Sequence, residues 1–157
     1  MEEKINAIQT LSQDLIDKLG FTAKVAVTED NGIFLIHITT DEDASMLIGK
    51  HARMLAALQR VLGAMLFKQL GETVDILVDV NDYRDAQKER LITIANNVAQ
   101  RVVEEARPAR LSSFSAYERK IIHEHINSNY HSLESFSEGE GKFRKLVIQK
   151  KNVEQTA

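Results

Sequence analysis

The sequence of 157 residues contains no cysteine, no tryptophan and a single proline. The absence of cysteine excludes a disulfide framework, a thiolate nucleophile and a cysteine-ligated zinc site. No apolar run reaches the roughly 18 residues that a membrane-spanning helix needs, and the N-terminus is acidic where a signal peptide would be basic. We therefore expect a cytoplasmic protein without stable membrane insertion.

Motifs for catalysis or cofactor binding are also missing. The sequence has neither a G-x-S-x-G elbow nor a G-x-G-x-x-G loop, and the loop over 138–141 is too short for a calcium site. His123 and His125 lie two residues apart, so on a helix they point in opposite directions and cannot share one metal ion. His125 is expected in the core. We expect no enzyme activity, no cofactor and no metal; a metal-dependent nuclease is the least favoured alternative.

Charge divides the chain into two parts. Residues 1–106 carry 11 Lys or Arg and 17 Asp or Glu, whereas residues 107–151 carry 9 and 5. An acidic first part and a basic second part suggest two units, and the second is directed toward an anionic partner.

The first part alternates between helical and strand periodicity. Apolar spacing predicts a helix over 3–19, strands over 21–27 and 33–38, helices over 41–48 and 52–70, and a strand over 74–80. Asn31-Gly32 is the favoured pair for a tight hairpin turn, which residues 28–30 could widen. The last strand follows a crossover and is expected to pair in parallel. Gly63 inside the long helix suggests close backbone packing.

A long helix that joins the two units is expected from Asp82 to near Pro108. Leu91, Ala95, Val98 and Val102 form its apolar stripe. Residues 110–113 are expected to be extended. Ser115 and Glu118 have the spacing of a capping box, which predicts a helix over 116–128. Runs over 130–137 and 143–149, separated by a glycine-containing loop, predict a β-hairpin.

The first candidate site is the turn that contains Gly49, Lys50, His51, Ala52 and Arg53. A glycine turn followed by a helix presents backbone N–H groups and the positive end of the helix dipole. It is not a Walker loop, because His51 replaces the required Ser or Thr. It suits a nucleic-acid phosphate; the alternative is an ordinary helix N-terminus with solvated charges.

The second candidate site is the pair Arg119 and His123. Positions i and i+4 are neighbours on one helix face. The guanidinium group of Arg can form a bidentate hydrogen bond with a phosphate or stack on a base. Lys120, Arg144 and Lys145 supply flanking charge. The alternative is a chance surface pair.

Several stretches together resemble a known arrangement. The order of elements through residue 80, with the Gly49 turn, resembles a type II KH domain and its GXXG loop. Ser115-Ala116-Tyr117-Glu118-Arg119 with Ile122-His123 is similar to an R-3-H domain, named for Arg-x-x-x-His. The order of the two, joined by a long helix, resembles the bacterial Jag (SpoIIIJ-associated) family. The other matching stretches are 47–51, 55–59, 78–80 with 83–84, 106–108, 137–141 and 144–148.

The resemblance implies an α+β fold with a type II KH domain over 1–81, an R-3-H domain with its connecting helix over 82–151, and a frayed tail over 152–157. It implies binding of single-stranded RNA, or single-stranded DNA. It also implies a homodimer or a heterodimer with a small KH protein, and post-transcriptional control linked to bacterial cell elongation and division. Many members have a further N-terminal domain, so this sequence is either a short member or a piece.

One position departs from the family pattern, which has glycine where this chain has Ala52. If Ala52 is the first helical residue, the phosphate turn can survive. Because aromatic residues make up only 6% of the chain, we expect weak, mainly electrostatic binding with low sequence specificity. The rival hypothesis is a protein-interaction adaptor that dimerises through the KH domain and binds little RNA.

Overall fold

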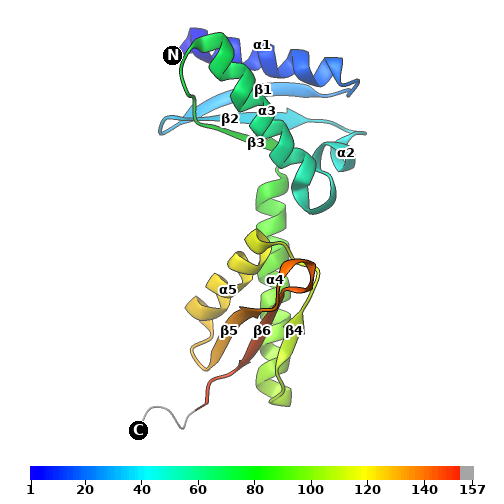
Figure 1. Cartoon of the computed structure of the whole chain (residues 1–157), viewed down its shortest axis with the longest axis vertical. Helices are drawn as coiled ribbons and strands as arrows, with labels where there is room; N and C mark the ends of the chain where they lie inside the picture. The colour runs from blue at the N-terminus through cyan, green and yellow to red at the C-terminus, as the bar shows by residue number, and fades with distance from the viewer. Residues whose placement is uncertain (153–157) are drawn as a thin grey trace. The chain divides into compact units, whose positions relative to one another are not determined.

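The computed structural model describes residues 1–152, and the expected frayed tail lies outside this range except for exposed Asn152. The fold is α+β, as expected, and the chain divides into two compact units (Figure 1). The first unit spans Met1–Arg84 and the second begins at Asp85. Each unit is described by itself below.

The first unit has the predicted order of elements. They are α1 (Glu2–Lys18), β1 (Lys24–Asp30), β2 (Ile33–Thr39), α2 (Ala44–Ile48), η1 (Lys50–Ala52), α3 (Arg53–Leu70) and β3 (Ile76–Val80). The sheet order is β1-β2-β3. Strands β1 and β2 are antiparallel, and β2 and β3 are parallel, so both predicted pairings are confirmed.

The β1–β2 connection is tighter than the sequence suggested. Asp30 pairs with Ile33, so only Asn31 and Gly32 form the turn. Both have positive φ, 51° and 86°, as a two-residue hairpin turn of this kind requires. Residues 28–30 belong to the ladder and do not widen the loop.

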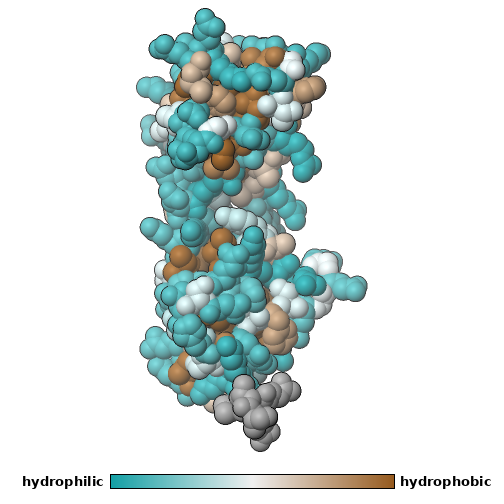
Figure 2. All heavy atoms as spheres, turned by 90° about the vertical axis from the view of Figure 1, so that its left-hand side faces the viewer, coloured by the Kyte–Doolittle hydropathy of each residue, from teal (hydrophilic) through white to brown (hydrophobic). Residues whose placement is uncertain are grey.

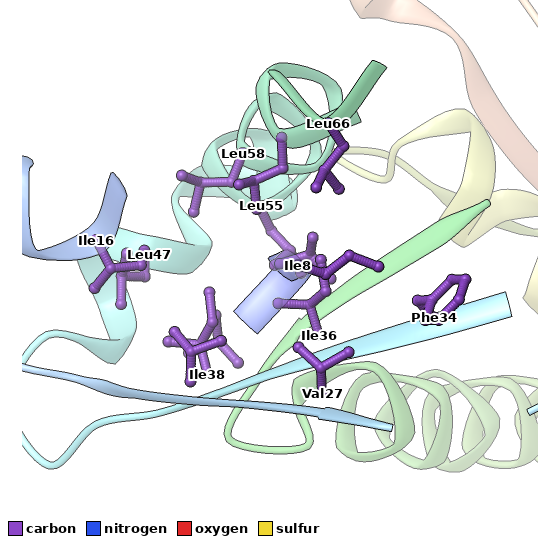
Figure 3. Close-up of a cluster of buried hydrophobic side chains, with 14 residues drawn as sticks. Ile8, Ile16, Val27, Phe34, Ile36, Ile38, Leu47, Leu55, Leu58 and Leu66 are labelled. Carbon is purple, nitrogen blue, oxygen red and sulfur yellow. The ribbon is translucent and has the colours of Figure 1, made fainter. Parts of the chain in front are cut away.

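The core of the first unit lies between its helices and its sheet. Figure 3 shows Leu55 and Leu58 of α3 and Ile8 of α1 gathered over Ile36 of β2. The apolar stripes of the sequence thus become one cluster. The inference about Gly63 is wrong, since a Cβ built there has no described atom within 4 Å.

The second unit packs helices on a small sheet. Its elements are α4 (Tyr83–Glu105), which starts at the end of the first unit, β4 (Ala109–Leu111), α5 (Ala116–Asn129), β5 (Leu133–Glu138), η2 (Gly141–Phe143) and β6 (Lys145–Lys150). The sheet order is β4-β6-β5, and both pairings are antiparallel. The predicted β5–β6 hairpin is confirmed.

Only one face of this sheet belongs to the apolar core. The stripe of α4, Ile122 and Ile126 of α5, and Leu133, Leu146 and Ile148 of the strands form one buried cluster. The opposite face carries Arg110, Val147 and Phe136 in one row across β4, β6 and β5. This alternation decides which side chains of β5 are available to a ligand.

Candidate nucleic-acid interface

The Gly49 turn, residues 49–53, is built by the backbone. Gly49 has φ 72° and ψ 173°, while His51 and Ala52 have φ of 54° and 56°. The Ala52 N–H donates to the Gly49 carbonyl at 3.1 Å, and the Arg53 N–H donates to the Lys50 carbonyl. These bonds close the turn before α3 begins.

Gly49 cannot be replaced without distortion. Its φ and ψ lie in a region that is essentially restricted to glycine. A Cβ there would lie 2.9 Å from Met54 Cβ and 3.0 Å from Met54 N. The close approach between this glycine and the first turn of α3 therefore fixes the shape of the site.

The expectation for Ala52 is wrong. Ala52 is not the first helical residue; it is the N-cap of α3 and has left-handed backbone geometry. An L-residue pays for this conformation in steric energy, which glycine avoids. Glycine at position 52 would adopt this backbone conformation without that steric cost.

The amino end of α3 retains an anion-binding character. Ala52 has no side-chain acceptor to cap the helix, so the first free N–H groups remain oriented outward. Lys50, His51 and Arg53 are all exposed. The turn thus presents the positive end of the helix dipole and two formal positive charges to an anion.

The second site is anchored by the predicted capping box, which is confirmed. Ser115 Oγ accepts from the Glu118 N–H at 3.2 Å, and Glu118 Oε2 accepts from the Ser115 N–H at 2.7 Å. Glu118 is buried, and its Oε1 also accepts from Gln87 Nε2 of α4 at 2.9 Å. The first turn of α5 is therefore tied to α4 within this unit.

Arg119 and His123 are both held in place by hydrogen bonds. Arg119 Nη1 donates to the Phe114 carbonyl at 2.8 Å. His123 Nδ1 lies 2.6 Å from Ser135 Oγ of β5, which is buried, and His123 Nε2 lies 3.0 Å from Asn127 Nδ2. Because an amide nitrogen is a donor, this network assigns Nε2 as acceptor and Nδ1–H as donor. Asn127 is exposed, so a ligand can displace it from Nε2.

These residues line one open pocket of about 340 Å³, here called the Arg119 pocket. Its wall comes from α5, the end of β5 and the residue that precedes β6, and consists of Ala116, Arg119, Lys120, His123, Phe136, Ser137 and Arg144. Arg144 Nη1 donates to the Gly139 carbonyl at 3.0 Å, which orients its guanidinium. The structure therefore brings four of the five predicted residues of this site together.

Lys145 is the exception. It lies on β6 opposite Glu138 and is not part of the pocket wall formed by the described residues. Sequence reasoning missed Phe136, Ser135 and Ser137. The alternation of side chains along β5 was the available signal, because it places Phe136 on the sheet face that points away from buried Leu133 and Ser135.

The two neighbouring histidines diverge, as their spacing predicted. His123 contacts β5, whereas His125 Nε2 lies 2.7 Å from Asn96 Oδ1 of α4. His125 is only half-buried, so its expected core position is wrong. Within residues 1–152, no cluster of three or more potential metal ligands is present.

Figure 2 and the described helices bear on the question of a membrane-spanning segment. Figure 2 shows a mainly hydrophilic face with small hydrophobic areas in both units. Among the described helices, none has the length and apolar character to cross a bilayer.

Comparisons with known proteins identify the second unit and the family. Residues 89–150 match the family model of the R-3-H domain, so that prediction is confirmed. The RNA-binding protein KhpB of Bacillus subtilis is 34% identical over 154 residues, which cover 95% of this chain and 73% of that protein. KhpB of Lactiplantibacillus plantarum is 29% identical over 147 residues, and KhpB of Streptococcus pneumoniae is 31% identical over 148. The matched region covers 45% and 44% of those two longer proteins. With 34% identity over most of the Bacillus subtilis protein, this chain belongs to the KhpB family.

Proposed function

We propose that the protein binds single-stranded RNA and is not an enzyme. The observation that carries this proposal is the Arg119 pocket, in which Arg119, Lys120 and Arg144 converge beside His123. Guanidinium groups in fixed orientations suit phosphate oxygens, which they bind in a bidentate manner. The name of the relatives, RNA-binding protein KhpB, supports RNA as the nucleic acid.

We further propose that residues 1–81 form a type II KH domain and that the Gly49 turn is its phosphate-binding loop. The mixed sheet, with one antiparallel and one parallel pairing, supports this assignment. So does a glycine turn that leads into α3 with exposed Lys50 and Arg53. A KH loop of this kind clamps the backbone of about four nucleotides.

The wider role follows the family resemblance. We propose post-transcriptional control linked to cell elongation and division. The KH unit would act as a dimerisation surface, either for a second copy or for a small KH protein. Two weak sites on a dimer would reinforce one another through effective concentration.

The test is fluorescence anisotropy with a labelled mixed-sequence single-stranded RNA at several salt concentrations. Arg119→Glu and Lys50→Glu reverse one charge in each site. Arg101→Glu makes the same charge change at an exposed position of α4 that is not in the described pocket wall. If the pocket neutralises three phosphates, the slope of log K against log salt is about −2. Arg119→Glu should abolish most of the binding and Arg101→Glu should change it little.

A protein-interaction adaptor is the second candidate. The observation that favours it is the exposure of Val61 and Phe67 on α3, although both are large and hydrophobic. Absence of RNA binding at low salt, together with a constitutive dimer in sedimentation across dilutions, would favour the adaptor. Equal affinity of wild type and an Lys50→Glu, Arg119→Glu double variant would do so too.

A further inference from the structure

The Arg119 pocket combines two kinds of chemistry. Arg119, Lys120 and Arg144 supply positive charge. Phe136 of the edge strand β5 also borders the pocket, and its ring, which lies on the outer face of the sheet, is 41% exposed. Phosphate binding alone does not require an exposed aromatic ring. A nucleotide has both an anionic backbone and a flat base, so the charged pocket and the ring beside it together match the two halves of one nucleotide.

The strand places Phe136 so that its ring faces outward. Ser135 is buried toward α5, where it meets His123, and the next residue of the strand must face the other way. Phe136 pairs in register with Val147 of β6, which is 1% exposed although it lies on the outer face of the sheet. Because cross-strand partners are side-chain neighbours, Val147 supports Phe136 from within the sheet.

We propose that Phe136 is a base-stacking residue: one unpaired base stacks on its ring while Arg119 and Arg144 hold the adjacent phosphate. The pocket is open, with a volume of about 340 Å³, and β5 is an edge strand, so a nucleotide whose phosphate lies in the pocket can extend around that edge to the ring. The inference rests on the RNA binding proposed above and specifies its ligand. The strand must be single at this position, because a duplex buries the faces of its bases. Binding is then not only electrostatic, contrary to the expectation from aromatic content.

The absence of tryptophan from the sequence makes a direct test possible. A Phe136→Trp variant carries one tryptophan, whose emission is quenched when a base stacks on it. Phe143→Trp is the matched control, because Phe143 is 76% exposed and lies in the connection of the same hairpin but is not in the described pocket wall. Both variants are titrated with mixed-sequence single-stranded RNA, with the same RNA annealed to its complement, and with inorganic polyphosphate.

We expect saturable quenching at position 136 by single-stranded RNA alone, with the midpoint that anisotropy gives for the same variant. Phe136→Leu, which keeps an apolar side chain beside Val147, should bind single-stranded RNA about 5- to 140-fold more weakly than wild type. Its affinity for the duplex should not change. Phe143→Leu should stay within about twofold of wild type.

Three results would overturn the inference. Unchanged emission at position 136 under saturating RNA would exclude stacking there, even if Phe136→Leu failed to fold. Wild-type affinity in Phe136→Leu, while Arg119→Glu loses binding, would refute the stacking and leave RNA binding intact. Equal quenching at positions 136 and 143 would show that the effect is not specific to the pocket. If wild type binds no single-stranded RNA at low salt, the proposed function fails together with this inference.

Discussion

The two candidate sites are constructed in opposite ways. The Gly49 turn is shaped by backbone conformation, with positive φ at Gly49, His51 and Ala52, and its charged side chains are exposed. The Arg119 pocket is shaped by side chains, each with a hydrogen-bond partner: Arg119 with Phe114, His123 with Ser135, and Arg144 with Gly139. The first site depends on backbone conformation and on the missing Cβ of Gly49, and the second depends on oriented polar side chains.

This difference determines how each site fails. A turn that stores backbone strain responds to glycine and alanine exchanges, even though these residues carry no functional group. A pocket of oriented side chains responds to loss of a partner, because the remaining buried polar group is left unsatisfied. Substitutions that act on one mechanism at a time can therefore separate the two sites.

Gly49→Ala should have the largest effect and should be confined to the first unit. The substitution puts a Cβ 2.9 Å from that of Met54 and places alanine in backbone geometry restricted to glycine. We expect a loss of about 2–4 kcal/mol in the free energy of unfolding. Urea denaturation measures it, and the binding that depends on Arg119 should persist.

Gly20→Ala is the matched control for this prediction. Gly20 also has positive φ, 86°, but a Cβ there meets no described atom within 4 Å. Its cost should be only that of the left-handed conformation, about 1–2 kcal/mol. Equal losses in the two variants would show that the contact with Met54 does not matter.

Glu118→Ala should have the next largest effect, and it acts on the second unit. It removes one half of the capping box and leaves the buried amide of Gln87 without its partner. Capping contributes about 1 kcal/mol and an unsatisfied buried amide costs about 1–3 kcal/mol. We therefore expect a loss of about 2–4 kcal/mol in urea denaturation, with weaker RNA binding by the Arg119 pocket.

Glu124→Ala controls for removal of a glutamate from the same helix. Glu124 is exposed and makes only a 3.8 Å ion pair with Lys120. Its effect on stability should stay within about 0.5 kcal/mol. If Glu118→Ala is equally mild, the contact between α4 and α5 does not position the pocket.

Features that depend on neighbouring residues could be predicted from the sequence, whereas features that depend on tertiary contacts could not. The hairpin at Asn31-Gly32 and the capping box of Ser115 were predictable, because each depends on neighbouring residues alone. The half-buried position of His125 was not, since it depends on Asn96, 29 residues away. The alternation of β5 indicates that Phe136 faces outward, but its position beside the pocket requires β5 to lie beside α5, which no local spacing reports.

Gly63→Ala should stabilise the first unit by about 1 kcal/mol. Alanine has the higher helix propensity, and an added Cβ meets no described atom within 4 Å at this position of α3. Thermal or urea unfolding measures the gain. A loss of stability would mean that another molecule covers this face of α3 in solution. If that loss disappears on dilution, the covering molecule is a second copy of this chain.

Ala52→Gly is the smallest expected effect, and it tests the strain of the Gly49 turn most directly. Relief of the left-handed conformation contributes about 1–2 kcal/mol, while the greater backbone freedom of glycine in the unfolded chain offsets about 0.5–1 kcal/mol. The net gain in the free energy of unfolding should be about 0.5–1 kcal/mol. Ala56→Gly, at an exposed position inside α3, should instead lose about 1 kcal/mol. If both substitutions destabilise equally, Ala52 is not strained. Ala52→Gly is also tested for RNA binding. If it strengthens binding, and if Lys50→Glu abolishes that binding, then alanine at position 52 weakens a functional phosphate site.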